Sequence, residues 1–282
     1  MTSTINPSPI ETGSGALPKI VLAAPDGARA EIYLHGAHVT SWIPAGGSEA
    51  LFLSRKADFL PGTAIRGGVP IIFPQFAGMG LLPKHGFART GAWELVESAA
   101  DHAALSLRES AGSLNTWPHK FELEYTVKIG GSQLELALKV SNTDSAPFEF
   151  TAALHTYLRV SNLGETSIWG LKGLRFSDSV NNEPLSVQKD EWLTFPGEVD
   201  RIYFKAATPV QVVQEHTKIG LEQAGFTDVV VWNPGPEKCA ALKDMQPDGY
   251  LEFVCIEAVV VEQPVKLAPG ENWTGTQTLV AA

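Results

Sequence analysis

Cysteine is scarce in this sequence: its 282 residues include two, Cys239 and Cys255, and neither belongs to a Cys-x-x-Cys pair. Small disulfide-stapled folds and structural zinc sites depend on paired cysteines, so both classes are excluded. Cys255 lies in an apolar run, where a buried free thiol is the usual finding. The chain must therefore be held together by its own core, and its 44% of hydrophobic residues can supply one.

Basic residues are also in short supply, with 21 Lys and Arg against 31 Asp and Glu and a formal net charge of -10. Nucleic-acid binding needs a broad basic face, so no nucleic-acid partner is expected. No apolar run approaches the ~18 residues of a membrane span. The first residues lack the basic and apolar regions of a secretory signal. These features predict a soluble cytoplasmic protein without a membrane partner, and nothing demands association beyond a monomer.

The dominant pattern is an alternation of apolar and polar residues, which is typical of half-buried strands. It is clearest in Phe121–Ile129 and Gln133–Ser141, which Gly130-Gly131 joins as a tight hairpin. Phe148–Val160 is another long alternating run. Many short strands and few helices together predict an all-β fold, a large antiparallel β-sandwich.

Helical patterns are confined to two short segments, Ala50–Leu53 and Lys238–Met245, each long enough for a turn or two. No linker and no repeat at a fixed period interrupts the succession of strands. Residues 1–18 are rich in Ser, Thr, Pro and Gly and are expected to form a loosely held arm. Residues 19–282 are expected to form a single domain.

One stretch stands out on this acidic chain, because Gly62–Arg89 contains Arg66, Lys84, His85 and Arg89 and no acidic residue. Glycines and prolines prevent a regular helix from running through it. Guanidinium groups and freed backbone N–H groups suit the oxygens of a phosphate or carboxylate. The stretch therefore predicts a site for a small anion. The alternative is a structural Gly/Pro loop whose cations are merely solvated.

His155 lies within the alternating run Phe148–Val160, on the polar face that also carries Tyr157 and Arg159. If that face lines a concave sheet, the imidazole is placed to act as an acid or base near neutral pH. The alternative is a structural histidine, which is the commoner role of a lone histidine on a strand.

Glu257 is the only charged residue in the apolar run Phe253–Val261. Burying a carboxylate is costly unless it is paired or used in chemistry. Low solvation would also raise its pKa toward a value useful for a general base. The alternative is a glutamate on an edge strand that faces water, and the apolar neighbours on both sides argue against it.

Other polar residues give weaker signals. Asp200 precedes Arg201 in a predicted loop and could accept a hydrogen bond from a substrate hydroxyl, but surface Asp-Arg pairs are common and the sequence does not decide. His35 and His38 have no third metal ligand nearby. No nucleophile elbow, phosphate-binding Walker loop or dinucleotide fingerprint is present. No cofactor and no metal are therefore expected.

Taken together, the sequence resembles the hexose-6-phosphate mutarotases, a branch of the aldose 1-epimerase superfamily. The matching pieces occur in the family's order over roughly residues 30 to 275. Single pieces are weak, but the ordered set is specific. The pieces are Gly36–Trp42, Ile65–Pro70, Phe73–Phe76, Leu82–Arg89, Ala153–Tyr157, Val199–Arg201, Val231–Pro234 and Cys255–Ala258.

The resemblance implies a galactose-mutarotase-like β-sandwich that binds a sugar phosphate on a concave sheet, with His155 and Glu257 as the catalytic pair. It implies phosphate contacts from Arg66, Lys84 and Arg89, a hydroxyl contact from Asp200, and places in the pocket for Gln75 and His85. One departure is Gly235, where relatives often have tryptophan after Asn-Pro, and it puts the fine specificity of the pocket in doubt.

The implied reaction fits residues found independently. Exchange of anomers needs a base for the proton of the anomeric hydroxyl and an acid for the ring oxygen. Glu257 as carboxylate and His155 as imidazolium supply both. One rival is an aldose 1-epimerase for neutral hexoses, although a neutral sugar does not need three cations. The other rival is a non-catalytic module that binds sugar phosphates.

Overall fold

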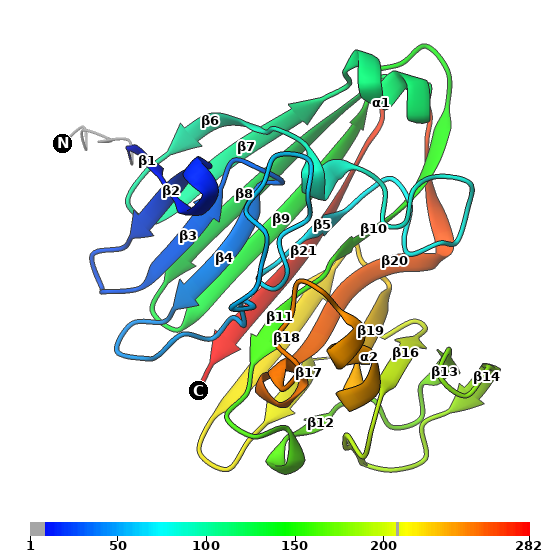
Figure 1. Ribbon diagram of the computed structural model, residues 1–282. Helices are drawn as coiled ribbons and strands as arrows, with labels where there is room; N and C mark the ends of the chain where they lie inside the picture. Colours follow the sequence, from blue (N-terminus) through cyan, green and yellow to red (C-terminus); the bar gives the residue numbers. More distant parts are fainter. Residues whose placement is uncertain (1–8, 207–208) are drawn as a thin grey trace.

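The structure is a computed structural model, and it describes residues 9–206 and 209–282. Across these residues the strands form three antiparallel sheets, which we name the N-terminal, central and outer sheets (Figure 1). The N-terminal sheet has the order β1 (Ile10–Thr12), β2 (Pro18–Ala23), β3 (Arg29–Tyr33) and β4 (His38–Ile43).

The central sheet has the long strand β20 in its middle. Its order is β14 (Glu183–Val187), β13 (Arg175–Asp178), β16 (Val199–Tyr203), β19 (Asp228–Asn233), β20 (Phe253–Leu267), β10 (Phe148–Leu154) and β5 (Ile71–Ile72), with β11 (Tyr157–Arg159) also paired to β20. Figure 1 shows β20 in orange beside β10 and β19.

The outer sheet contains the longest hairpin of the chain. Its order is β15 (Trp192–Leu193), β12 (Ser167–Trp169), β17 (Pro209–Val213), β18 (Lys218–Ala224), β21 (Asn272–Ala281), β9 (Gln133–Asn142), β8 (Phe121–Gly130), β7 (His102–Arg108) and β6 (Glu94–Ser98). Helical structure in the described ranges is limited to α1 (Ala111–Thr116), α2 (Gly235–Ala241) and the single 3-10 turns Ser14–Ala16, Ala88–Thr90, Leu163–Glu165 and Gly249–Glu252.

The main core lies between the central and outer sheets. One face of β20 supplies Val254, Ile256 and Ala258 to it, and strands of the outer sheet supply side chains such as Leu136 and Leu279. The opposite face of β20 is covered as well, by smaller apolar clusters. Because β20 is buried on both faces, its sequence is an almost unbroken apolar run.

The predicted antiparallel all-β architecture is confirmed, and β8 and β9 form the predicted hairpin, with its turn at Gly131-Ser132, one residue later than expected. The helix expected over Lys238–Met245 is present only in part, because α2 spans Gly235–Ala241 and residues 242–245 are not helical. The segment Ala50–Leu53 is not helical, because Leu51 and Leu53 form isolated β-bridges. Of the expected N-terminal arm, residues 1–8 lie outside the described residues, and β1 pairs with β2.

The glycine-rich stretch crosses closely over two other backbones. Gly67 and Gly68 have φ angles of 111° and 60°, which favour glycine. A Cβ at Gly67 would lie 2.4 Å from the carbonyl oxygen of Phe52, and one at Gly68 would lie 2.2 Å from that of Val39. These two glycines therefore let the chain pass between its neighbours and continue into Val69 and β5.

His38 anchors this crossing from β4. Its Nε2 lies 2.8 Å from the carbonyl oxygen of Gly67, so Nε2 carries the hydrogen and donates it. The side chain is fully buried, and burial lowers the pKa of His38 from 6.5 to about 4. The folded protein thus holds this imidazole uncharged at neutral pH.

This burial predicts a loss of stability in acid. Below pH 6.5 the unfolded chain can protonate His38 while the folded protein cannot, so His38 costs stability as the pH falls from 6.5 to about 4. At about 1.4 kcal/mol per pKa unit the loss reaches about 3 kcal/mol. Urea unfolding of wild type and His38→Gln at pH 7.5 and pH 5 measures it. The variant should show a shallower dependence on pH than wild type and than a control, His216→Gln, which changes an exposed histidine; equal slopes in all three proteins would contradict the prediction.

None of the helices in the described part of the chain is long and apolar enough to cross a membrane.

Candidate active site

The pairing of β10 and β11 with β20 brings together the two residues singled out for chemistry. Leu154 lies opposite Ala258, and Tyr157 lies opposite Cys255. Continuing either register by one or two residues places His155 directly opposite Glu257. The predicted single strand Phe148–Val160 is interrupted here, because the backbone N–H of His155 donates to Pro70 of the glycine-rich stretch.

His155 and Glu257 touch, and both are incompletely bonded. Nε2 of His155 lies 3.4 Å from Oε1 of Glu257. The residues are 8% and 2% exposed. Nδ1 of His155 and Oε2 of Glu257 are buried without a hydrogen-bond partner in the described structure. Buried polar atoms are rarely left in this state, and each such atom costs stability. The pair therefore has unused hydrogen-bonding capacity that a bound molecule can fill.

Aromatic rings fix the imidazole in place. The Tyr157 ring stacks on the His155 ring with centroids 4.8 Å apart and an angle of 8°. Trp232 packs edge-on against both His155 and Tyr157, at 5.9 and 6.0 Å. The ring of His85 meets His155 from another side at 5.8 Å. This packing restricts the imidazole to one orientation in front of Glu257.

Burial shifts the pKa values of the pair in opposite directions. It raises the pKa of the Glu257 carboxyl well above its usual range, and Asp200 adds to the rise while Arg89 and Lys84 oppose it. Burial likewise lowers the pKa of His155 well below its usual range, and the charges of its neighbours lower it further. Burial therefore favours a protonated Glu257 beside a neutral His155. This differs from the ion pair expected from the sequence.

Three basic side chains, Arg66, Lys84 and Arg89, lie near this pair. Arg89 is partly buried, its Nη2 donates to the carbonyl oxygen of Lys84 at 3.2 Å, and its Nε is buried with no partner in the described structure. The Lys84 side chain is exposed. Arg66 donates to Asp244 and to the hydroxyl of Tyr157. All three predicted cations lie near enough to the His155–Glu257 pair for their charges to act on the pKa of one or both members.

His85 is a neutral hydrogen-bond donor. Its Nδ1 accepts a hydrogen bond from the backbone N–H of Ala77 at 3.2 Å, so Nε2 carries the hydrogen. Burial lowers the pKa of His85 to about 3, and the charges of Arg89, Lys84 and Arg66 contribute. At neutral pH the ring therefore stays uncharged and keeps its one N–H.

Asp200 lies on the same face of the central sheet as Glu257. It pairs with Trp232 in the register of β16 and β19, and Trp232 pairs with Cys255 on β20, two residues from Glu257. Asp200 is partly buried, and burial raises the pKa of its carboxyl. The sequence placed it in a loop; the structure places it in β16, facing the site.

Gln75 braces the loop that carries the cations. Its side-chain amide donates to the carbonyl oxygens of Ala77 and Leu82, and its oxygen accepts from the N–H of Leu82. These bonds use both amide hydrogens of Gln75 and leave one lone pair of its oxygen for a substrate. Its main visible effect is therefore on the shape of the loop.

The backbone conformation at position 235 requires a glycine. It begins α2 with a φ of 62°, and a Cβ here would lie 2.7 Å from the backbone nitrogen of Glu198. A tryptophan at this position would need a different path for the loop that ends at Glu198.

Sequence reasoning missed three residues of the site. Tyr157 and Trp232 were part of matching motifs, but nothing in those motifs indicated that their rings pack against the imidazole of His155. Asp244 follows α2 in a loop and carries no sequence signal at all. Its importance is visible only from its contact with Arg66, a residue 178 positions away along the chain.

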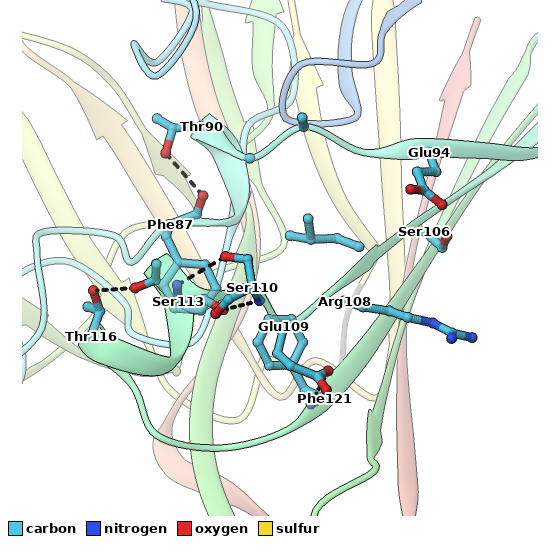
Figure 2. A pocket seen from close by; sticks show the side chains of 14 residues that line it. Phe87, Thr90, Glu94, Ser106, Arg108, Glu109, Ser110, Ser113, Thr116 and Phe121 are labelled. Carbon is cyan, nitrogen blue, oxygen red and sulfur yellow. Dashed lines mark hydrogen bonds between the residues drawn. The ribbon is translucent and has the colours of Figure 1, made fainter.

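Two surface hollows lie apart from this group. One of about 480 Å³ lies between α1 and β7, and Figure 2 shows its hydroxyl-bearing side chains. Ser113 N–H donates to Ser110, Thr90 donates to the carbonyl oxygen of Phe87, and Thr116 donates to that of Gly112, so these hydroxyls are engaged locally. The other, of about 790 Å³, lies near Arg159 and the end of the chain. Neither is lined by any of the eight predicted site residues.

No group of three or more His, Cys, Asp or Glu side chains in the described ranges is arranged to hold a metal ion. Cys239 and Cys255 are both buried free thiols. His155 and Glu257 can each gain or lose a proton, and the residues around them carry hydrogen-bonding groups and charge.

Comparison with known proteins decides the family. The sequence profile described as aldose 1-epimerase matches residues 18–280. The chain belongs to the aldose 1-epimerase family. A relative from Cenchrus ciliaris, named "Putative glucose-6-phosphate 1-epimerase", is 37% identical over 296 residues, which cover 98% of this chain and 89% of the relative.

Solved structures agree with this family assignment. A crystal structure from Salmonella typhimurium, described as that of a "putative mutarotase", superimposes with a TM-score of 0.87 and 32% identity over 98% of this chain and 97% of the other. A galactose mutarotase-like protein from Lactobacillus casei shares the fold alone, with a TM-score of 0.75 and 17% identity over 94% of this chain and all of the other. The predicted galactose-mutarotase-like sandwich is confirmed. The protein is thus an epimerase of aldoses, which interconverts the anomers of its sugar.

Proposed function

We propose that this aldose 1-epimerase family member acts on hexose 6-phosphates, interconverting the α and β anomers of glucose 6-phosphate. The observation that carries the proposal is the 3.4 Å contact between His155 and Glu257, with Arg66, Lys84 and Arg89 near enough for their charges to act on the pair. The name of the Cenchrus ciliaris relative supports the choice of sugar. A monomer acting in the cytoplasm is part of the proposal and rests on the sequence features given above.

Ring opening requires a proton to leave the hydroxyl on C1 and another to reach the ring oxygen. Both oxygens are bonded to C1, so two groups in contact with one another can serve them together. Glu257 accepts the proton from the hydroxyl, and His155 donates to the ring oxygen; the roles reverse on closure after rotation about C1–C2. Each positioned proton transfer contributes about 10²–10⁴ in rate.

The pair works with one shared proton. Burial favours that proton on Glu257, whereas the reaction as written starts with the proton on His155. Arg89 and Lys84 favour the ionised form of Glu257, because the charges of both lower its pKa. The fixed N–H of His85 is available to a sugar oxygen beside His155. Asp200 is assigned to a sugar hydroxyl, and Gln75 to supporting the loop and the pocket edge.

The cations supply the preference for a phosphorylated sugar. Phosphate binding at Arg66, Lys84 and Arg89 uses energy remote from C1 to align the reacting atoms. A neutral hexose cannot use this energy. The proposal therefore predicts a higher kcat/KM for glucose 6-phosphate than for glucose.

Magnetisation-exchange NMR of the two anomers tests the proposal directly, because exchange rates for glucose 6-phosphate and glucose can be measured in the same buffer. We expect the protein to accelerate exchange of glucose 6-phosphate, with at least a tenfold advantage over glucose, since one charge-assisted hydrogen bond is worth about 1.5–3 kcal/mol. Equal acceleration of both sugars would indicate an epimerase for neutral hexoses. Binding of glucose 6-phosphate without any acceleration would indicate a non-catalytic module.

A further inference from the structure

Arg66 is held by a carboxylate. Its Nε and Nη2 both lie 3.0 Å from Oδ2 of Asp244. The two side chains are 25% and 23% exposed, so the ion pair is largely withdrawn from water. A negative charge at this place repels a phosphate that approaches Arg66, and like charges brought together in a binding site are costly. The presence of Asp244 therefore needs a reason other than phosphate affinity.

The remaining contacts of Arg66 suggest that reason. Its Nη1 donates to the hydroxyl of Tyr157 at 3.1 Å. Arginine has five N–H groups in one plane, so three are engaged and two remain. The guanidinium is thereby fixed at three points before any substrate arrives.

The backbone also ties Asp244 to Arg66. The N–H of Ser54 donates to the carbonyl oxygen of Arg66 at 3.0 Å. The hydroxyl of Ser54 donates to the carbonyl oxygen of Asp244 at 2.7 Å. One residue therefore holds both members of the ion pair at a set distance, which limits independent movement of either loop.

The contacts continue from Arg66 to the reacting centre. The hydroxyl of Tyr157 accepts from Arg66, and the ring of Tyr157 lies flat against His155. In a hexose 6-phosphate, C6 and C5 separate the phosphate ester from the ring oxygen. The series Asp244, Arg66, Tyr157, His155 thus extends from the phosphate end of such a substrate to the group assigned to its ring oxygen.

We propose that Asp244 is a specificity-determining positioning residue, which fixes the Arg66 guanidinium so that a phosphate bound there aligns the ring oxygen with His155. This inference rests on the proposed action on hexose 6-phosphates. Asp244 does not touch the substrate. Its negative charge weakens the attraction of the site for phosphate, but its contact with Arg66 aligns the bound substrate. Removal of Asp244 should therefore lower kcat, and only for substrates that carry a phosphate.

The test is the kinetics of Asp244→Ala with glucose 6-phosphate and with glucose. With glucose 6-phosphate we expect kcat to fall about 10- to 100-fold, because a small misplacement of a bound substrate can cost up to ~10²-fold. KM should change less than about threefold, because two effects on phosphate affinity oppose each other. Ordering the mobile Arg66 side chain on binding costs free energy, whereas loss of the Asp244 carboxylate removes a repulsion. With glucose, kcat and KM should stay within about twofold of wild type, because no phosphate engages Arg66.

Matched variants control for folding. Asp248→Ala removes another acid of the same loop, whose pair with Arg55 is exposed, and should match wild type on both sugars. Asp244→Asn keeps the shape of the side chain and should show the same selective loss if Asp244→Ala fails to fold. Asp244→Glu restores the charge and should recover part of kcat.

Two results would overturn the inference: equal losses of kcat on both sugars, or no loss of kcat on glucose 6-phosphate. These outcomes are distinct from a failure of the proposed function. If wild type shows no preference for glucose 6-phosphate over glucose, the function itself is wrong. If wild type shows the preference and Asp244→Ala retains both the preference and kcat, the inference alone is wrong.

Discussion

Replacing Glu257 by glutamine is expected to slow anomer exchange of glucose 6-phosphate by about 10²–10⁴-fold, the usual contribution of a positioned acid or base. Glutamine keeps the size of the side chain and can still hydrogen-bond, but it cannot take up a proton. Magnetisation-exchange NMR measures the loss, and calorimetric titration with glucose 6-phosphate should show that binding persists.

Glu262→Gln is the matched control, because Glu262 lies on the same strand, β20, and pairs with Arg175 near the surface. It should exchange anomers at the wild-type rate. Glu257→Gln should be at least as stable as wild type, since Oε2 of Glu257 is buried without a partner. Exchange by Glu257→Gln within threefold of wild type would remove Glu257 from the chemistry.

Removing two cations together should change substrate preference more than any other substitution. For the double variant Lys84→Ala/Arg89→Ala we expect kcat/KM for glucose 6-phosphate to fall about 10²–10⁴-fold, because each charge-assisted hydrogen bond is worth about 1.5–3 kcal/mol. The loss should appear in both kcat and KM, because phosphate binding at these cations also aligns the reacting atoms. Glucose carries no phosphate, so its kcat/KM should change less than about threefold. Arg66 is kept, because its removal would leave Asp244 partly buried and unpaired.

The control is Arg108→Ala/Lys128→Ala, which removes the same charge from exposed positions of the outer sheet. It separates a local effect on phosphate from a general effect of net charge. Initial rates with both sugars at several concentrations give the two constants. Equal losses of kcat/KM on glucose and glucose 6-phosphate in the Lys84/Arg89 variant would favour an epimerase for neutral hexoses.

The sequence predicted the parts of the fold in which one face of a strand is apolar. The hairpin of β8 and β9 alternates without interruption, and its two-residue turn, Gly131-Ser132, fixes the register. Strands β13 to β16 were not predicted as strands, because all are short and three of them, β13, β14 and β16, mix polar and apolar residues without a clear alternation. Asp200 was accordingly placed in a loop, although β16 sets its direction.

The sequence indicated which residues are candidates for the site, but it did not indicate how these residues lie relative to one another. Glu257 could be identified because a lone carboxylate in an apolar strand is costly, and His155 because it lies on a polar strand face. Their contact depends on the register of β20 against β10 and β11, a pairing over about a hundred residues that no local pattern encodes. Asp244 had no signal, since a loop aspartate looks the same whether it meets solvent or an arginine.

The protonation of the pair could not be predicted either. A sequence shows which groups can titrate, but the direction of each shift depends on how completely the fold excludes water. Here burial works against both charged forms, and Asp200 adds to the effect on Glu257. The reaction implied by the family resemblance requires a carboxylate on Glu257 and an imidazolium on His155.

A crystal structure of Glu257→Gln with glucose 6-phosphate would test the central claim most directly, because the slow variant can hold an intact substrate. We predict that the C1 hydroxyl lies within hydrogen-bonding distance of residue 257, that the ring oxygen faces His155, and that Arg66, Lys84 and Arg89 contact the phosphate. A sugar bound with its phosphate at His155, or bound away from the central sheet, would contradict the account.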